Sequence, residues 1–101
     1  MRLGRVCGNV VATVKADGLS SYKLLLVREV DPRDPLGGDG DASAAVYAAV
    51  DLVGVGEGEI VLVAHGGAAR VDEGTARVPT DAAIVAIVDS ARLDSRTTFV
   101  K

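Results

Sequence analysis

The chain carries one histidine, His65, and one cysteine, Cys7, the two residue types best suited to nucleophilic chemistry. If the fold brought them together, the imidazole could activate the thiol as a nucleophile. Cys7 lies in an apolar segment, where a free cysteine usually packs as a small hydrophobic residue. His65 follows an apolar run and precedes two glycines, a common position for an exposed polar side chain. Both surroundings favour structural roles, and we predict no catalytic residues.

Four aspartates gather in one loop-like segment between residues 31 and 43, at Asp31, Asp34, Asp39 and Asp41. Carboxylates are good calcium ligands, but this spacing lacks the pattern and the closing glutamate of an EF-hand loop. Prolines and glycines among acids are typical of a solvated loop. One histidine and one cysteine also cannot form a structural zinc site of the usual kind. We therefore predict no bound metal.

The segment Gly-Val-Gly-Glu-Gly-Glu at residues 54–59 is similar to a dinucleotide-binding loop. The pattern G-x-G-x-x-G fails, because Glu59 stands where the third glycine belongs. A strand-like run follows the segment, whereas a phosphate site needs a helix N-terminus. We predict a tight turn between strands and no cofactor.

Three aspartates, Asp51, Asp81 and Asp89, adjoin apolar segments. Paired carboxylates can perform acid–base catalysis. An aspartate at a strand end more often accepts backbone N–H bonds in a turn, or pairs with an arginine such as Arg70. Arg70 itself follows two glycines and two alanines, which is typical of a packed junction or a pore-lining turn.

Short β-branched runs bounded by glycine predict the elements that must position these residues. The predicted strands cover residues 3–14, 22–30 and 59–64 and, within the segment 83–93, the run Ile84–Val88, with a short edge strand at 97–100. Residues 44–53 are alanine-rich enough for a helix, but Val46, Tyr47 and Val50 favour a strand that Asp51 ends. A loop fills residues 31–43, and a brief helical turn follows His65. Asp81 could be the N-cap of a second turn.

The amino-acid composition also favours β-strands, and it excludes several classes of protein. The 101 residues include 17 Val and 15 Ala but only three Phe and Tyr together and no Trp, with a net charge of −3. A mildly acidic chain with few aromatics is unsuited to nucleic acid. A single cysteine excludes an internal disulfide, and no apolar run is long enough for a membrane helix. No signal peptide is recognisable, so we expect the protein to lie in the cytoplasm. The pattern predicts one domain over residues 1–101, a small closed barrel or sandwich.

Five segments in this order resemble one protein family. They are residues 3–15, residues 23–28, the Val-Asp and glycine-spaced stretch 49–63, the Gly-Gly-Ala-Ala-Arg turn 66–70 and the Pro-Thr-Asp to Ile-Val-Asp ending 79–89. The family is that of the EutN/CcmL-type bacterial microcompartment shell proteins, which form pentameric vertices. Gly67 and Ala68 depart from the usual Ser-Ser, Thr80 replaces the usual Val, and the loop 31–43 is longer and more acidic than in the family.

The resemblance implies an all-β fold, a five-stranded barrel of the oligonucleotide/oligosaccharide-binding (OB) type with one or two short helical turns. It implies a homopentamer without enzyme activity that caps the vertices of a microcompartment shell in the cytoplasm. Hexameric shell proteins are the implied partners, trimeric ones are further candidates, and neither nucleic acid nor membrane is expected. The resemblance places a pore or inter-subunit turn at Gly66, Gly67, Ala68, Ala69 and Arg70. The alternative is a small-ligand-binding barrel or an accessory enzyme subunit that uses His65 and Arg70.

Overall fold

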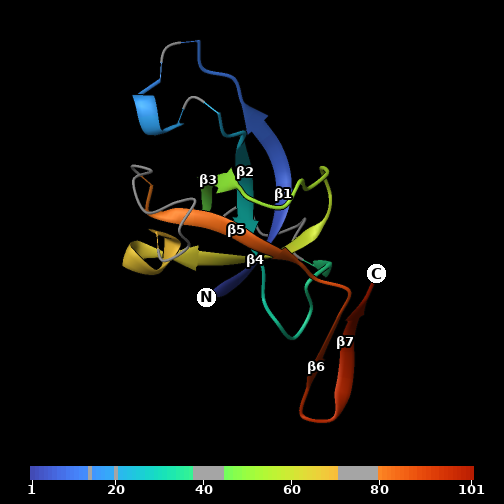
Figure 1. Cartoon of the computed structure of the whole chain (residues 1–101). Helices are drawn as coiled ribbons and strands as arrows, with labels where there is room; N and C mark the ends of the chain where they lie inside the picture. The colour runs from blue at the N-terminus through green and yellow to red at the C-terminus, as the bar shows by residue number, and fades with distance from the viewer. Residues whose placement is uncertain (14, 20, 38–44, 71–79) are drawn as a thin grey trace.

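The computed structural model describes residues 1–13, 15–19, 21–37, 45–70 and 80–101 (Figure 1). In chain order the elements are β1 (Arg2–Val10), η1 (Asp17–Leu19), β2 (Leu24–Glu29), β3 (Val46–Asp51), β4 (Ile60–His65), η3 (Gly66–Arg70), β5 (Ala82–Ile87), β6 (Ser90–Leu93) and β7 (Arg96–Val100). The segment around residue 46 is therefore a strand rather than a helix, as its β-branched residues indicated.

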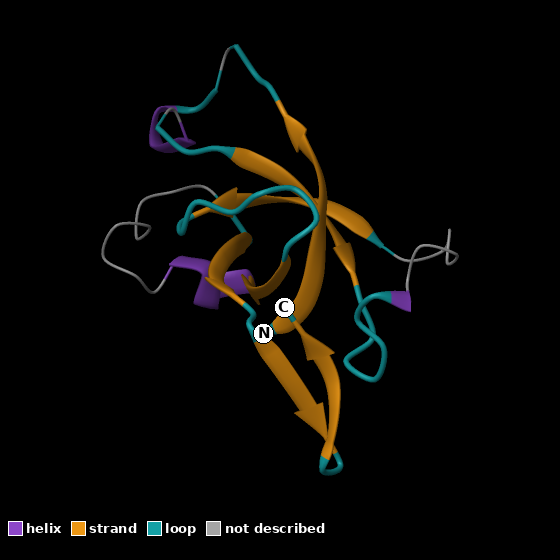
Figure 2. Ribbon diagram, turned by 90° about the vertical axis from the view of Figure 1, so that its right-hand side faces the viewer, coloured by secondary structure: helices purple, strands orange, loops and turns teal. Residues whose placement is uncertain are grey.

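Five of these strands close into a barrel in the order β1-β2-β3-β5-β4 (Figures 1 and 2). Neighbouring strands run antiparallel, except for β3 and β5, which run parallel. The predicted all-β fold with a five-stranded barrel and short helical turns is confirmed. β6 and β7 form a separate two-stranded sheet outside the barrel.

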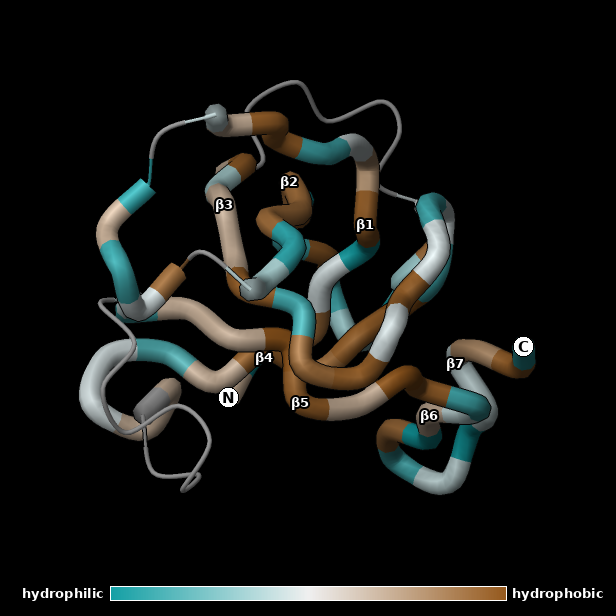
Figure 3. Tube along the Cα trace, turned by 45° about the horizontal axis from the view of Figure 1, so that its top comes forward, coloured by the Kyte–Doolittle hydropathy of each residue, from teal (hydrophilic) through white to brown (hydrophobic). Residues whose placement is uncertain are grey.

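Side chains from alternate strand positions fill the barrel interior. The interior cluster consists of Val6, Leu25, Val27, Ala49, Val55, Val61, Val63, Ala82 and Ile84. Most of these are β-branched, and each fully buried Val or Ile contributes roughly 1.5–3 kcal/mol of hydrophobic free energy. Figure 3 shows the apolar stretches concentrated along the barrel strands. The barrel is thus a packed core.

Glycine permits close contact between β1 and β2. A Cβ at Gly4 would collide with the Val27 side chain and would lie 3.3 Å from the carbonyl oxygen of Arg28. Further along β1, the pairing with β2 shifts register between Val6 and Gly8. This bulge is the bend that the glycines of the first strand predict.

A second apolar cluster lies outside the barrel wall. Val50, Ala69 and Ala83 are its buried members, and Leu19, Tyr22, Leu24, Leu52 and Val85 pack against it. The cluster joins η1 and η3 to the outer faces of β2, β3 and β5. The two helical turns are therefore held by packing rather than by their own short hydrogen-bond runs.

The central strand predicted at Ile84–Val88 is confirmed as β5, and the last residues of the segment 83–93 belong to a different sheet. β5 ends at Ile87, and β6 begins at Ser90 in the other sheet. β6 then pairs with β7, so the predicted edge strand 97–100 is half of a hairpin. Two polar residues, Asp89 and Ser90, separate the apolar run Ile84–Val88 from Ala91, although no glycine or proline stands at the break.

The first strand and Asp81 also differ from the prediction. β1 ends at Val10 rather than at residue 14, which lies outside the described residues. No helical turn follows Asp81, since β5 begins at Ala82. The hydroxyl of Thr80 accepts the Ala82 N–H at 3.1 Å, so Thr80 makes the turn that had been assigned to Asp81.

The first residues of the acidic loop make more hydrogen bonds and packing contacts than the composition of the loop predicts. Asp31 accepts hydrogen bonds from the backbone and the guanidinium of Arg33, the shortest at 2.7 Å, and these bonds lower the pKa of Asp31. Pro35 is fully buried, whereas Leu36 is exposed. Residues 38–43, with Asp39 and Asp41, lie outside the described residues.

Asp51 organises the turn that leaves β3, as expected for an aspartate at a strand end. Its carboxylate accepts three backbone N–H bonds, from Val53 at 3.0 Å, Gly54 at 2.9 Å and Val55 at 2.9 Å. Gly54 adopts a φ of 83°, a left-handed conformation that favours glycine. The predicted turn at residues 54–58 is confirmed, and β4 rather than a helix follows it.

Replacing Asp51 by Ala should destabilise the fold by roughly 1–3 kcal/mol, because it removes the acceptor of three backbone donors next to the buried Val55. Glu57→Ala, at an exposed position of the same turn, is the matched control and should change stability by less than about 0.5 kcal/mol. Urea denaturation followed by circular dichroism measures both. Equal stabilities for the two variants would contradict this role.

Candidate inter-subunit turn

The turn η3 follows the end of β4 directly and leaves the barrel at one end (Figure 1). Gly66, its first residue, has a φ of 62°, which a side chain with a Cβ rarely adopts. The Gly66 N–H donates to the carbonyl oxygen of Asp81 at 2.7 Å, which ties the turn to the start of β5. Gly66 therefore adopts a backbone conformation that favours glycine over any other residue.

The side chains of the turn divide into an exposed part and an anchored part. Gly66, Gly67 and Ala68 are exposed, and among the described residues no atom outside the turn lies within 4 Å of a Cβ built at either glycine. Ala69 is buried in the outer cluster with Val50 and Ala83. The turn thus presents a nearly side-chain-free backbone on a fixed base. The side chain of Arg70 lies outside the described residues, so its predicted pairing stays a prediction.

His65 is less exposed than the sequence indicated, because its imidazole enters the barrel end beside Tyr47. The two ring centroids are 5.1 Å apart in an edge-on arrangement. Among the described residues, the Tyr47 hydroxyl and the His65 Nε2 are buried and have no hydrogen-bond partner. Burial raises the pKa of Tyr47, and the nearby Glu29 carboxylate acts in the same direction. This pair, which closes one end of the barrel, is a feature that sequence reasoning missed.

A thiol–imidazole pair is not formed. The Cys7 Sγ lies 3.6 Å from the carbonyl oxygen of Leu26, on the β1–β2 ladder. The His65 ring instead contacts Tyr47 at the end of β4. Cys7 therefore packs within the sheet, as its apolar context predicted.

The described residues also bear on metal and membrane binding. Within residues 1–13, 15–19, 21–37, 45–70 and 80–101, no three His, Cys, Asp or Glu side chains are grouped closely enough to hold a metal ion. None of the helical turns in the described part of the chain is long and apolar enough to cross a bilayer.

Comparison with known proteins identifies the class of protein to which this closed five-stranded barrel belongs. The family model "Ethanolamine utilisation protein EutN/carboxysome" matches residues 1–89. The carboxysome shell vertex protein CcmL of Thermosynechococcus vestitus is 40% identical over 102 residues, which cover 100% of this chain and 96% of that protein.

Solved structures agree with the sequence match. The CcmL structure of Gloeobacter violaceus superposes with a TM-score of 0.85 at 34% identity and covers 100% of this chain and 98% of its own. The pentameric microcompartment shell protein GrpN of Rhodospirillum rubrum has a TM-score of 0.75 at 39% identity, over 92% of this chain and 99% of its own.

The chain therefore belongs to the EutN/CcmL family of microcompartment shell vertex proteins. The family resemblance and the structural, non-enzymatic role that it implies are confirmed.

Gly66→Val should destabilise the subunit by about 1–3 kcal/mol, because a β-branched residue is strained at this positive φ. Gly67→Ala is the matched control, since Gly67 has no positive φ and open space around it, and it should be tolerated. Denaturant midpoints and the mass in solution report fold and assembly separately. A Gly66→Val variant as stable as Gly67→Ala would contradict the conformational requirement.

His65→Ala tests the residue before Gly66, and here we expect no loss of assembly. It removes the contact with the Tyr47 ring but also removes a buried nitrogen without a partner, and these effects oppose each other. We expect the oligomer to stay intact. Loss of assembly in this variant would assign the imidazole a direct role in subunit contact.

Proposed function

We propose that five copies of this chain form a ring that caps the vertices of a bacterial microcompartment shell. The match along the whole chain to shell vertex proteins, with a pentameric shell protein among the structural neighbours, is the observation that carries this proposal. The chain then acts in the cytoplasm as a structural part of the shell, with residues 1–101 as one vertex domain.

Geometry explains why a shell needs such a subunit. A flat layer of six-fold tiles has no intrinsic closure, and five-fold positions supply the corners. A five-fold ring needs heterologous contacts, in which one face of each subunit meets a different face of the next. We infer that hexameric shell proteins surround this ring and bind its outer rim, with trimeric shell proteins as further candidates.

In this ring, the turn at Gly66, Gly67, Ala68, Ala69 and Arg70 lies at the inter-subunit junction near the five-fold axis. Support comes from its exposed, nearly side-chain-free backbone, which lets neighbouring chains approach closely. Its anchor, Ala69, is buried in the outer cluster and holds the turn in one position relative to the barrel.

The second candidate function, a ligand-binding barrel or accessory enzyme subunit, is not favoured. It requires His65 to face a ligand, whereas the imidazole packs against Tyr47 at the barrel end. It also requires space within the barrel, which apolar side chains fill.

Native mass spectrometry of the purified chain should show one dominant species at five times the subunit mass of 10.3 kDa. The packed barrel with exposed apolar residues on its outside provides the physical reason, because such residues are covered when subunits associate. Glu57→Ala, at an exposed turn outside the proposed junction, is a suitable control that should give the same species. A dominant monomer or dimer would count against the vertex role.

Co-expression with the matching hexameric shell protein should convert open sheets or tubes into closed polyhedral shells, seen by electron microscopy. Only small amounts of this chain are required, because corners are few compared with facets. The chain should co-purify with the closed shells. Shells that close equally well without it would contradict the proposed function.

A further inference from the structure

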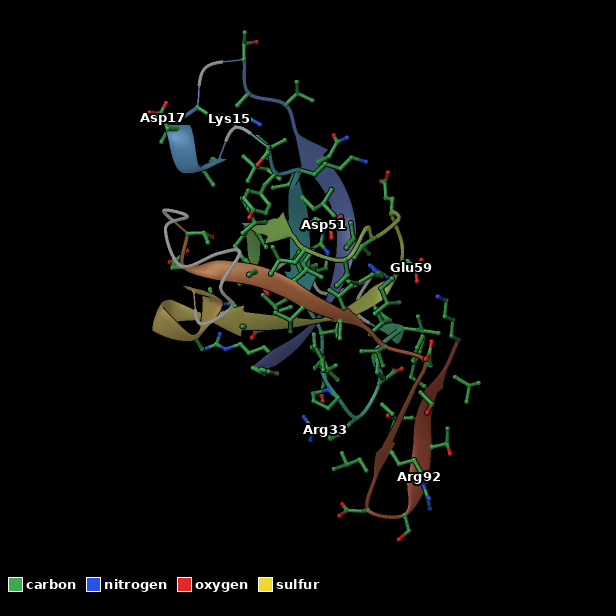
Figure 4. All side chains as sticks on the ribbon, viewed as in Figure 1. Lys15, Asp17, Arg33, Asp51, Glu59 and Arg92 are labelled. Atoms are coloured by element: carbon green, nitrogen blue, oxygen red, sulfur yellow. The ribbon has the colours of Figure 1, made fainter. Side chains whose placement is uncertain are left out.

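A small pocket lies at the end of the molecule where β1 stops and β2 begins. Val10 of β1 and Leu24 of β2 form the last pair of that ladder. Beyond this pair the two chain segments separate around a cavity of about 250 Å³, which we call the lysine pocket. Figure 4 shows Lys15 beside η1 at this end of the molecule and Arg92 of the β6–β7 hairpin at the other end. The pocket is therefore remote from the hairpin.

Aliphatic side chains from both strands line the lysine pocket. They include Val10, Val11, Leu24 and Leu25. Leu25 is buried in the barrel interior, whereas Val11 is 89% exposed. Exposed aliphatic groups beside a concave surface gain free energy when an apolar group covers them. This lining favours a ligand with an aliphatic part.

Two lysines supply the charge of the pocket. Lys15 and Lys23 line it, and none of the described residues that line it is acidic. The Lys15 ammonium donates to the Tyr22 carbonyl oxygen at 3.3 Å, which holds it across the loop. An ammonium has three N–H donors, so two stay available to a ligand. Neither lysine takes part in the ion pairs formed among the described residues, although the chain as a whole is acidic.

Size and chemistry together define the class of ligand. The cavity of about 250 Å³ is smaller than the roughly 300–1,000 Å³ of pockets for drug-sized molecules, which points to a small ligand. A bare inorganic anion would leave the aliphatic wall uncovered, and a cation would meet two ammonium groups. A short aliphatic chain that ends in a carboxylate matches both parts of the lining. Its chain covers the valines and leucines, and its carboxylate accepts charge-assisted hydrogen bonds from the lysines.

We propose that the lysine pocket binds short aliphatic carboxylates, with the chain against Val10, Val11 and Leu24 and the carboxylate at Lys15 and Lys23. The same chemical group is offered by a free aliphatic acid and by the C-terminal aliphatic residue of a peptide. The barrel interior takes no part, since apolar side chains fill it. This inference is independent of the proposed pentamer and adds a ligand site to a structural subunit.

A titration with three small probes tests both parts of the lining. Hexanoate carries the chain and the carboxylate, acetate carries only the carboxylate, and hexylammonium carries the same chain with the opposite charge. In methyl NMR spectra of the native protein, hexanoate should give saturable shifts at Val11 and Leu24, and the other two probes should not at equal concentration. Each methylene added between butyrate and hexanoate should tighten binding by up to about fourfold, because it buries further apolar surface. Equal shifts with hexylammonium, or no saturable shift with hexanoate, would overturn the inference.

Two pairs of variants locate the site. Val11→Asp should weaken hexanoate binding by about fivefold or more, because an apolar contact is lost and a carboxylate repels the ligand. Val53→Asp is its matched control, since Val53 is 43% exposed and does not line the pocket. Lys23→Gln should weaken binding about two- to fivefold, whereas Arg28→Gln, which removes a cation of β2 outside the pocket, should not. Controls that weaken binding as much as their partners would overturn the inference.

A further pair of probes separates the two sources of the carboxylate. The peptide acetyl-Gly-Gly-Leu with a free carboxylate presents the group as the end of a protein chain, and its C-terminal amide lacks the charge. Tighter binding of the acid peptide than of hexanoate supports a protein C-terminus as the ligand, and weaker binding supports a free acid. An amide that binds as tightly as the acid peptide would overturn the inference, because the carboxylate would then play no part. Native mass spectrometry tests the pentamer separately, so failure of one proposal is distinguishable from failure of the other.

Discussion

The closure of the barrel depends on its narrowest seam, the parallel contact between β3 and β5. Only Val50 with Ala83 and Asp51 with Ile84 pair there, whereas the other neighbouring strands share four to six residue pairs. One hydrogen bond extends this seam beyond β3, because the Leu52 N–H donates to the Ile84 carbonyl oxygen at 3.3 Å. Next to it, Asp51 links β3 to the chain before β2 through its N–H, which donates to the Lys23 carbonyl oxygen at 3.0 Å, and its carboxylate holds the following turn. The buried Val50 and Ala83 then cover the seam from outside together with Ala69.

The closed and filled barrel leaves only the outer surface of the molecule for contacts with other molecules. The interior is filled by small and β-branched side chains, so the barrel is a rigid body rather than a container. The features available for contact with other molecules lie outside the barrel, where closure positions the glycine turn at Gly66, the groove lined by Leu24 and Val50, and the β6–β7 hairpin. The outer cluster around Val50 links the first two, because Ala69 of the turn and Leu24 of the groove both belong to it.

The barrel could be predicted from the sequence because its strands are short, β-branched and bounded by glycine, as in the run from Ile60 to His65. The role of Asp51 was also predictable, since a strand-end aspartate before glycines commonly accepts backbone donors. Gly66 followed from its place between a buried strand and small residues. Local patterns of this kind report local geometry well.

Long-range pairings were harder to predict. Asp89 and Ser90 mark the end of the barrel strand, but they do not show that the next strand, β6, leaves the barrel for a separate sheet. The contact between Tyr47 and His65 joins residues from two strands that do not pair with each other, so neither sequence position signals it. Asp94-Ser95 between two short alternating runs was the available signal for the hairpin, and it is weak because neither residue is glycine.

A vertex subunit needs a fixed angle to its neighbours in the ring and a surface that selects the right neighbours, and different parts of this chain supply the two. A ring of five tolerates little variation in the angle between subunits, which a packed barrel with buried anchors such as Ala69 can hold. Choosing the right neighbours instead requires surfaces free to vary without disturbing that core. The β6–β7 hairpin meets this condition, since it lies outside the barrel sheet and an ion pair between Lys101 and Glu59 joins its end to the residue before β4. Exposed residues of the hairpin such as Leu93 can therefore change while the barrel and its seam keep their geometry.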